Sequence, residues 1–557
     1  MAESRGLFVR DATGLVREIG FLLGALIIIA HTVGLGWQKR AFQFSAMPLP
    51  TEKMWLGLPP IFWAFLLGGF MILVIGFVAG LSTATMPRSG GGYVVISRVL
   101  HPFLGYFGGW LIYLAEGFSF GLIATAVFEA IMLFYGIAGV PVTMNADQLA
   151  IGGIILVIIF SILAFFGVRM YGYILHVMFW IPAAITILFF AMWIAGAMNP
   201  DVVAKGVEIA MGVTPKEVFD VAIDLGMIEA SKEVSFISAL SYAMIGAFWA
   251  YIGFYHVTYL AGEVKEANVK IPWIVVAASA VIVIVYIAAS ALSSIAAMNA
   301  YRASTAEGEF TFFQAYSYLS YSADPSKVRE AIPAFKSAWS TGLASMIAQG
   351  MGLGWVSWLI ALAGVLWLAN DIPPFLLVCS RVFFAMAFDR MLPEKFSEVS
   401  ERWHSPIWAI VATMIAGIIG AVAEASESGL PGAVSALSGK MLWAGVLGTD
   451  VYDAFFLILF CLSTTILPLR RKDIYDLSVV KLSKGLWVFV GAIGTIFSCI
   501  LMWMFLSVSW ADLTIPEYYG PTLVLFIIGW ALYGYYWWKN KARGIDVKTI
   551  YTMIPPE

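Results

Sequence analysis

The sequence predicts an all-α integral membrane protein with twelve transmembrane helices, and three observations support this prediction. Of its 557 residues, 61% are hydrophobic and only 12% are charged, whereas soluble domains contain about 25% charged residues. Apolar windows of about 20 residues, the length that crosses a bilayer, recur along the chain. Two of these windows contain glycines and polar residues at their centres, which a simple lipid-facing helix does not need.

Twelve windows are long enough to be transmembrane helices. They are 17–38, 58–84, 103–135, 148–167, 172–198, 235–261, 271–298, 349–388, 405–423, 449–468, 486–509 and 519–538. At 1.5 Å per residue the third would reach about 50 Å, so we expect it to be strongly tilted. The eighth contains Asn370-Asp371-Ile372-Pro373-Pro374, which should kink or break it.

The placement of Lys and Arg predicts that both termini are cytoplasmic and that the protein is a multi-pass protein of the cell membrane. The predicted segments are a cytoplasmic N-terminal segment 1–16, five helices in 17–198, an extracellular loop 199–234, five helices in 235–468 with a long extracellular loop 299–348, two helices in 486–538, and a cytoplasmic tail 539–557. We expect short interfacial helices in the 299–348 loop, either as connectors or as a lid. An aromatic belt at the inner interface is formed by Tyr533, Tyr535, Tyr536, Trp537 and Trp538.

The composition also argues against several classes of protein. A net charge of -3 gives no indication of a nucleic-acid partner. The three cysteines, Cys379, Cys461 and Cys499, are odd in number and imply no disulfide framework. No phosphate-binding loop supports ATP-driven pumping, and five scattered histidines do not favour a haem enzyme. We therefore expect no enzymatic activity, no cofactor and no bound metal. The oligomeric state is left open.

Two windows are interrupted by glycines. The first contains His31-Thr32-Val33-Gly34-Leu35-Gly36-Trp37, and the sixth contains Phe248-Trp249-Ala250-Tyr251-Ile252-Gly253-Phe254-Tyr255-His256. Glycine permits the backbone conformations needed where a helix stops in mid-membrane. Interrupted helices in corresponding places are the best sequence indication of a transporter's binding site.

The backbone at these interruptions is suited to a zwitterion. Amide groups at the start of the restarted first helix would bind a carboxylate, and freed carbonyls around Gly253 would accept hydrogen bonds from an ammonium group. An amino acid is the favoured substrate. The candidate substrate-binding residues are Thr32, Gly34, Leu35, Gly36, Trp249, Tyr251, Gly253 and Tyr255. The alternative is that the glycines serve only helix packing.

Ionisable residues inside a membrane are costly and usually face an internal cavity. The candidates for binding a coupling ion or proton are His31, His256, Asp371 and Glu116. A histidine titrates near neutrality and suits a coupled proton, whereas Asp371 could bind sodium or take a proton. Asp371 could instead cap a helix that restarts at Pro373, and Glu116 could simply form an interhelical hydrogen bond.

Several stretches resemble the amino acid-polyamine-organocation (APC) permease superfamily. They are Pro87–Arg98 followed by Gly105–Trp110, Phe248–Phe254 followed by Gly262–Lys265, and Cys379–Asp389 followed by Leu392-Pro393 and Ser405-Pro406. The resemblance implies that helices 1–5 and 6–10 are inverted repeats, with two further C-terminal helices. It also implies that Trp249 closes over the substrate and that the helix carrying Asp371 flanks a coupling-ion site.

The chain departs from the family pattern at three places. The first interruption reads Gly34-Leu35-Gly36-Trp37-Gln38 where the family pattern resembles Gly-Ser-Gly-Ile-Phe, and Tyr255 replaces an acidic residue found in many members. The lysine that some proton-coupled members carry in helix five is absent from Phe179-Trp180-Ile181-Pro182.

Charged residues near the inner ends of the helices are candidates for a cytoplasmic gate. They are Arg88, Glu263, Lys265, Arg381 and Asp389, which could form ion pairs or remain solvated. The predicted function is a secondary active transporter that moves amino acids by alternating access, coupled to protons or sodium or acting as an exchanger. The alternatives are a polyamine or organic-amine permease and a non-transporting scaffold subunit of a membrane complex.

Overall fold

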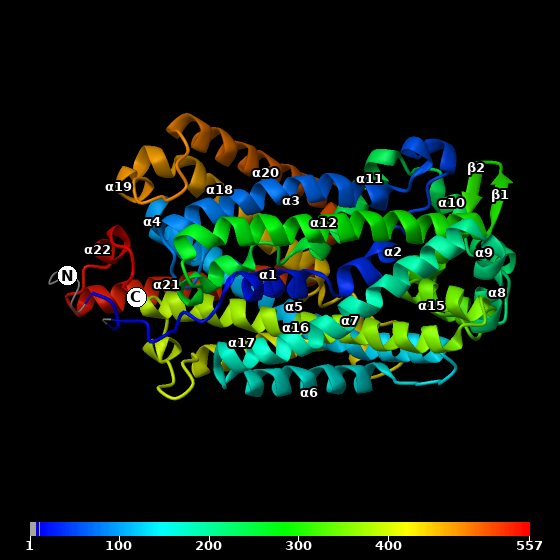
Figure 1. Cartoon of the computed structure of the whole chain (residues 1–557), viewed down its shortest axis with the longest axis horizontal. Helices are drawn as coiled ribbons and strands as arrows, with labels where there is room; N and C mark the ends of the chain where they lie inside the picture. Colours follow the sequence, from blue (N-terminus) through cyan, green and yellow to red (C-terminus); the bar gives the residue numbers. More distant parts are fainter. Residues whose placement is uncertain (1–6, 11, 557) are drawn as a thin grey trace.

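Long helices run side by side along one direction in the computed structural model, which describes residues 7–10 and 12–556 (Figure 1). The first described residues and α22 (Val547–Thr552) lie at one end of this bundle, which we call the terminal face. The opposite end carries an antiparallel hairpin of β1 (Arg302–Thr305) and β2 (Gly308–Thr311), and we call it the hairpin face. The predicted segment 1–16 lies partly outside the described residues.

Eleven helical segments among the described residues are long and apolar enough to cross a membrane. They are Phe21–Gln43, α3 (Pro60–Thr85), α5 (Pro102–Ile137), α6 (Ala146–Ala164), α7 (Gly167–Met198), Phe236–Glu263, α12 (Ala267–Ala300), α16 (Gly354–Phe388), α17 (Ile407–Ser426), α18 (Val446–Arg470) and α20 (Lys484–Leu513). The predicted twelfth span lies within α21 (Pro516–Ala542), a continuous helix. It is not among the eleven because its Tyr- and Trp-rich second half is less apolar. The all-α membrane fold is confirmed.

The first and sixth segments are both broken, as the glycines predict. The first consists of α1 (Phe21–Thr32), a π-helical turn Gly36–Arg40 and α2 (Ala41–Gln43). The sixth consists of α11 (Phe236–Tyr251) and a 3-10 helix, His256–Glu263. In each case the helical hydrogen bonding stops near the middle of the segment.

The eighth segment differs from its prediction in two ways. It starts at Gly354, because residues 340–350 form a separate helix, α15 (Ser340–Gly350). It also continues through Pro373 and Pro374 without a break. Helices α5 and α7 pack along it, and such neighbours allow a membrane helix to keep prolines in its interior. Asp371 therefore lies in mid-helix, and the helix-capping alternative is wrong.

Short elements cover the two faces. The loop after α7 folds into α8 (Pro200–Met211), α9 (Pro215–Asp224) and α10 (Met227–Ser231). The loop after α12 forms the hairpin, α13 (Phe312–Tyr321) and α14 (Pro325–Ala331). Capping boxes at Thr214 and Thr311 start α9 and α13. The terminal face has α4 (Gly92–Val99), α19 (Lys472–Tyr475) and α22. The remaining turns are 3-10 segments at Thr51–Lys53, Trp55–Gly57, Glu394–Ser397, Val434–Leu437 and Leu442–Ala444.

The two broken segments lie inside the bundle, surrounded by other helices. Helix α1 contacts α7, α12 and α16, and α11 contacts α3, α18 and α20. Helix α5 packs against α16, α17 and α18, and α12 packs along α3. This arrangement removes both breaks from lipid and surrounds them with neighbouring helices.

Candidate functional site

The two helix breaks touch each other. Gly253 has a φ of +111°, and a methyl group on it would overlap the His31 ring and lie 2.8 Å from Thr32 Oγ1. The Tyr286 hydroxyl, from α12, donates to the carbonyl of Thr32 and lies 3.1 Å from the carbonyl of Ala250. The end of α1 and the end of α11 are therefore joined both by direct contact and through one side chain.

The glycines of the first break permit two further close contacts. A Cβ on Gly34 would lie 2.7 Å from Asp371 Cγ, and a Cβ on Gly36 would lie 2.5 Å from Ala250 Cα. Both glycines thus permit close approach of a neighbouring helix. For Gly34 the neighbour is a buried carboxylate: Asp371 is only 2% exposed, and among the described residues its Oδ1 has no hydrogen-bond partner.

The carbonyls of the second break are largely engaged in this conformation. The amides of Phe254, His256 and Thr258 donate to the carbonyls of Tyr251, Gly253 and Tyr255, respectively. Each of these three carbonyls therefore already accepts one backbone hydrogen bond.

A cluster of three buried ionisable side chains lies beside the breaks. Glu116, from α5, places its Oε2 3.4 Å from His31 Nε2 and its Oε1 3.0 Å from His256 Nε2. All three residues are at most 2% exposed, and the two imidazole rings lie 4.2 Å apart. None of their side-chain nitrogens and oxygens completes a well-aligned hydrogen bond within the described residues. The sequence placed His31 and His256 on either side of the two breaks, where they could approach the same cavity, and the structure adds Glu116 between them.

This cluster has two chemical capacities. Two imidazoles and a carboxylate in contact can share one or two protons, with the carboxylate charge balanced by whichever ring is protonated. Their ligand atoms also lie within 4.8 Å of one another, and two histidines with one glutamate form a donor set that zinc uses. The sequence predicted no metal site here.

The three aromatic candidates occupy distinct places. The Arg40 guanidinium lies over the Trp249 ring, 4.8 Å from the centre of that ring. The Tyr251 hydroxyl donates to the carbonyl of Phe65 at 2.8 Å, and the Tyr255 hydroxyl donates to Asp453 Oδ1 at 2.7 Å. Both tyrosines are fully buried, so each ties the second break to a neighbouring helix.

A charged network lies on the hairpin-face side of the breaks, and its basic residues, Lys39 and Arg40, were missed by the sequence reasoning. Lys39 pairs with Glu129 and lies 2.8 Å from Glu424 Oε1, while Arg40 Nη2 lies 3.3 Å from the same carboxylate. The available signal was the adjacent Lys39-Arg40 pair directly after an apolar window. Since Arg40 also packs on Trp249, this network reaches the end of α11 beside the second break.

Two buried aspartates near the start of α18 were also missed. Asp453 accepts the hydrogen bond from Tyr255, whereas both carboxylate oxygens of Asp450 lack a partner within the described residues. Both residues are completely buried. Their position inside a predicted span was a sufficient signal, because buried acids in a membrane usually face a functional cavity.

Charged residues on the terminal-face side form two buried ion pairs. Arg381 binds Glu263 through both Nε and Nη2, at 2.8 and 2.9 Å. Arg98 donates to Asp389 through Nη1 and Nη2, at 2.6 and 2.8 Å, so this pair is bidentate as well. Asp389 also accepts a hydrogen bond from Tyr93. Although burial favours a neutral guanidinium, the Asp389 carboxylate raises the pKa of Arg98. Both pairs are buried between the helices on the terminal-face side of the breaks.

The other two gate candidates lie differently. Arg88 donates from Nε to the carbonyl of Pro555 at 2.7 Å, and burial together with the nearby Arg17 lowers its pKa to about 10. Lys265 is exposed, and its backbone amide, not its side chain, bonds to the carbonyl of Ile19. Sequence position alone did not separate these residues from Glu263 and Arg381.

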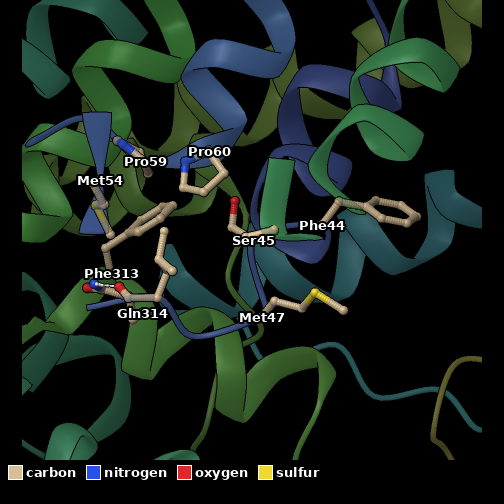
Figure 2. A pocket seen from close by; sticks show the side chains of 10 residues that line it. Phe44, Ser45, Met47, Met54, Pro59, Pro60, Phe313 and Gln314 are labelled. Atoms are coloured by element: carbon tan, nitrogen blue, oxygen red, sulfur yellow. Dashed lines mark hydrogen bonds between the residues drawn. The ribbon is translucent and has the colours of Figure 1, made fainter. Parts of the chain in front are cut away.

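A small cavity lies on the hairpin-face side of the first segment. Its volume is about 10 Å³, and it is bounded by residues that include Phe44, Met54 and Gln314 (Figure 2). Gln314 Nε2 donates to the carbonyl of Leu49 at its edge. A cavity of this volume holds about one water, so it cannot take an organic solute.

A model of one protein family matches most of the chain. It is described as amino acid permease and covers residues 56–545. The chain belongs to the amino acid permease family. The match includes the second break and Glu116, Asp371 and both terminal-face ion pairs, while the first break precedes it. This multi-pass membrane protein is therefore a transporter of the APC superfamily and not an enzyme. A search of curated proteins finds no match to this permease.

Proposed function

We propose that this permease is a secondary active transporter that moves amino acids across the cell membrane by alternating access and is coupled to protons. One observation carries the proposal: two broken helices meet at Gly253, and a buried His31–Glu116–His256 cluster lies directly beside that contact. Transport then consists of separating the two breaks toward one face at a time.

The substrate binds where the breaks meet. Thr32, Gly34, Leu35 and Gly36 contribute the start of the restarted first helix, and its amides suit a carboxylate. The turn at Gly253 contributes carbonyls for an ammonium group. Because both sets of groups are buried in this closed conformation, the substrate replaces contacts that the breaks now make with each other and with Tyr286.

The proton is the favoured coupling ion because the cluster contains two histidines. Its three side chains come from both broken segments and from α5, so a change in their charge acts directly on the contact between the breaks. Asp371 is the candidate for sodium, since its carboxylate lies against Gly34 and one of its oxygens has no partner in the part of the chain that the structure describes.

The proposed architecture has helices 1–5 (17–198) and 6–10 (235–468) as inverted repeats, with the terminal face cytoplasmic. The Glu263–Arg381 and Asp389–Arg98 pairs then form the cytoplasmic gate, and Lys39 and Arg40 with Glu129 and Glu424 form the external gate. The broken helices are the first of each set of five, as this architecture requires.

The test is uptake into proteoliposomes of the purified permease under an imposed pH gradient or sodium gradient. Glu116→Gln should lose accumulation driven by the pH gradient while retaining exchange of internal for external amino acid. Glu330→Gln, an exposed change in α14, is the matched control and should behave as the wild type. Undiminished pH-driven accumulation by Glu116→Gln, or accumulation driven only by sodium, would contradict the proposed coupling.

A second candidate is a permease for organic amines. It is favoured by the acidic character of the buried site, where Asp371, Asp450 and Asp453 lie in addition to Glu116. A substrate with amino groups but no carboxylate would then depend on these acids, and Asp371→Asn should abolish binding of a diamine while sparing a zwitterion. Stabilisation of the wild type by diamines but by no amino acid would favour this candidate.

A further inference from the structure

A large open cavity lies on the terminal face, away from the helix breaks. Its volume is about 840 Å³, within the range of pockets that hold small organic ligands. Its wall is formed by the start of α5, the end of α18, the second half of α21 and the C-terminal helix α22. We call it the basic-aromatic cavity, after the residues Arg470, Arg471, Lys548, Tyr533 and Trp537 that line it.

The charge of the cavity is predominantly positive. Arg471 is bound to Asp473, which is the one carboxylate in the lining, and Arg98 is bound to Asp389. Arg470 and Lys548 are exposed, and no carboxylate lies within ion-pair distance of either among the described residues. Asp546 is near Lys548, but its carboxylate caps α22 by accepting from the backbone amide of Lys548 and from Thr549. Two cations from α18 and α22 are therefore free to bind an anion.

The aromatic side chains place the cavity at the level of the lipid headgroups. Tyr533 and Trp537 lie one turn apart near the end of α21, next to Tyr536 and Trp538. Tyr and Trp are enriched where a membrane helix leaves the hydrocarbon. Basic pockets between helices at this level suit the phosphate of an anionic lipid.

We propose that the basic-aromatic cavity binds the phosphate headgroup of an anionic membrane lipid through Arg470 and Lys548. The bound headgroup links α22 to α18. This matters for the rest of the permease because α22 also covers the terminal-face ion pair: the Tyr551 ring lies 5.0 Å from the Arg98 guanidinium, and Arg98 binds Asp389. Arg471 Nη2 reinforces the same contact by donating to the carbonyl of Thr552 at 2.9 Å.

The experiment measures thermal unfolding of the full-length permease, stripped of lipid in a neutral detergent. Three additions are titrated separately: a short-chain phosphatidylglycerol, a short-chain phosphatidylcholine and inorganic phosphate. The expected result is a rise in melting temperature with phosphatidylglycerol alone. In the Arg470→Gln/Lys548→Gln double variant the apparent affinity should fall about thirtyfold, since each cation near an anionic surface contributes on the order of a factor of five.

A matched double variant removes two other cations from the same face. Lys472→Gln/Lys481→Gln changes the net charge equally, but neither residue lines the cavity, so its response to phosphatidylglycerol should equal that of the wild type. Equal stabilisation by phosphatidylcholine, or an unchanged response in Arg470→Gln/Lys548→Gln, would overturn the proposal. Stabilisation by inorganic phosphate at the same concentration would overturn the assignment to a lipid and identify a free phosphate as the ligand.

Discussion

Gly253 in the second helix break lies directly against His31 in the first, with the Thr32 side chain beside it. At this point the backbone of one broken segment touches a side chain of the other. A change in the separation of the two breaks must therefore alter this contact.

Replacing Gly253 by alanine should abolish uptake. Its φ of +111° is unfavourable for any residue with a Cβ, and that Cβ would also overlap His31. The backbone strain alone costs about 1–3 kcal/mol, and the overlap forces the breaks apart. Uptake in proteoliposomes and the melting temperature of the purified protein measure the two effects.

Gly139→Ala is the matched control for this change. Gly139 has a φ of +93° at the end of α5, and a Cβ there would meet nothing within 4 Å. It should lose a similar amount of stability through strain and retain uptake. If both variants transport equally well, the contact between Gly253 and His31 has no part in transport.

Replacing Tyr286 by phenylalanine should loosen the link between the two breaks. The hydroxyl that donates to Thr32 and lies beside the Ala250 carbonyl would be lost, which lowers the free energy of unfolding by about 1 kcal/mol. The rate of exchange transport should change because the link must break and reform in each cycle. Thermal unfolding and exchange kinetics measure the two consequences.

Tyr316→Phe removes a comparable bond that does not join the two breaks: the Tyr316 hydroxyl donates to the carbonyl of Ser337 at 3.2 Å. It should reduce stability to a similar degree with unchanged exchange kinetics. An equal change of kinetics in both variants would mean that the effect of Tyr286→Phe is one of general stability.

The broken helices could be predicted from the sequence, whereas the connections around them could not. The otherwise apolar windows contain Gly34, Gly36 and Gly253. Glycine permits local backbone conformations that interrupt a helix, so its presence in such a window predicts a break. The meeting of His31, Glu116 and His256 depends on how α5 packs across both segments, which no local pattern encodes. Likewise, Asn370-Asp371-Ile372-Pro373-Pro374 has the local pattern of a break, but packing against α5 and α7 keeps α16 continuous.

Replacing Glu263 by glutamine should destabilise the closed terminal face. Arg381 is 1% exposed and would be left without its carboxylate, and breaking a buried pair in this way costs about 3–5 kcal/mol. We expect a lower melting temperature and faster labelling of buried cysteines such as Cys379 by a thiol reagent.

The swapped pair Glu263→Arg/Arg381→Glu should recover part of the loss, because it restores opposite charges at the same positions. Asp220→Asn, which removes half of the exposed pair Lys216–Asp220, is the control and should leave the melting temperature and labelling unchanged. If the swapped pair is no better than Glu263→Gln, the pairing of these two charges is not what closes this face.

Replacing Trp249 by leucine should weaken the closure on the hairpin-face side. The Arg40 guanidinium lies 4.8 Å from the centre of the Trp249 ring in a buried setting, where a cation–π contact contributes about 2 kcal/mol. Without the ring, Arg40 keeps its contact with Glu424 but loses the aromatic surface on which it packs beside the breaks. We expect a several-fold faster release of bound substrate, and Trp249→Phe should be intermediate because a smaller ring remains.

Trp408→Leu removes the ring beneath Lys395, a contact of 4.6 Å at an exposed position on the terminal face. That control should leave release unchanged, and a Trp249→Leu variant that releases substrate at the wild-type rate would exclude Trp249 as a lid over the site.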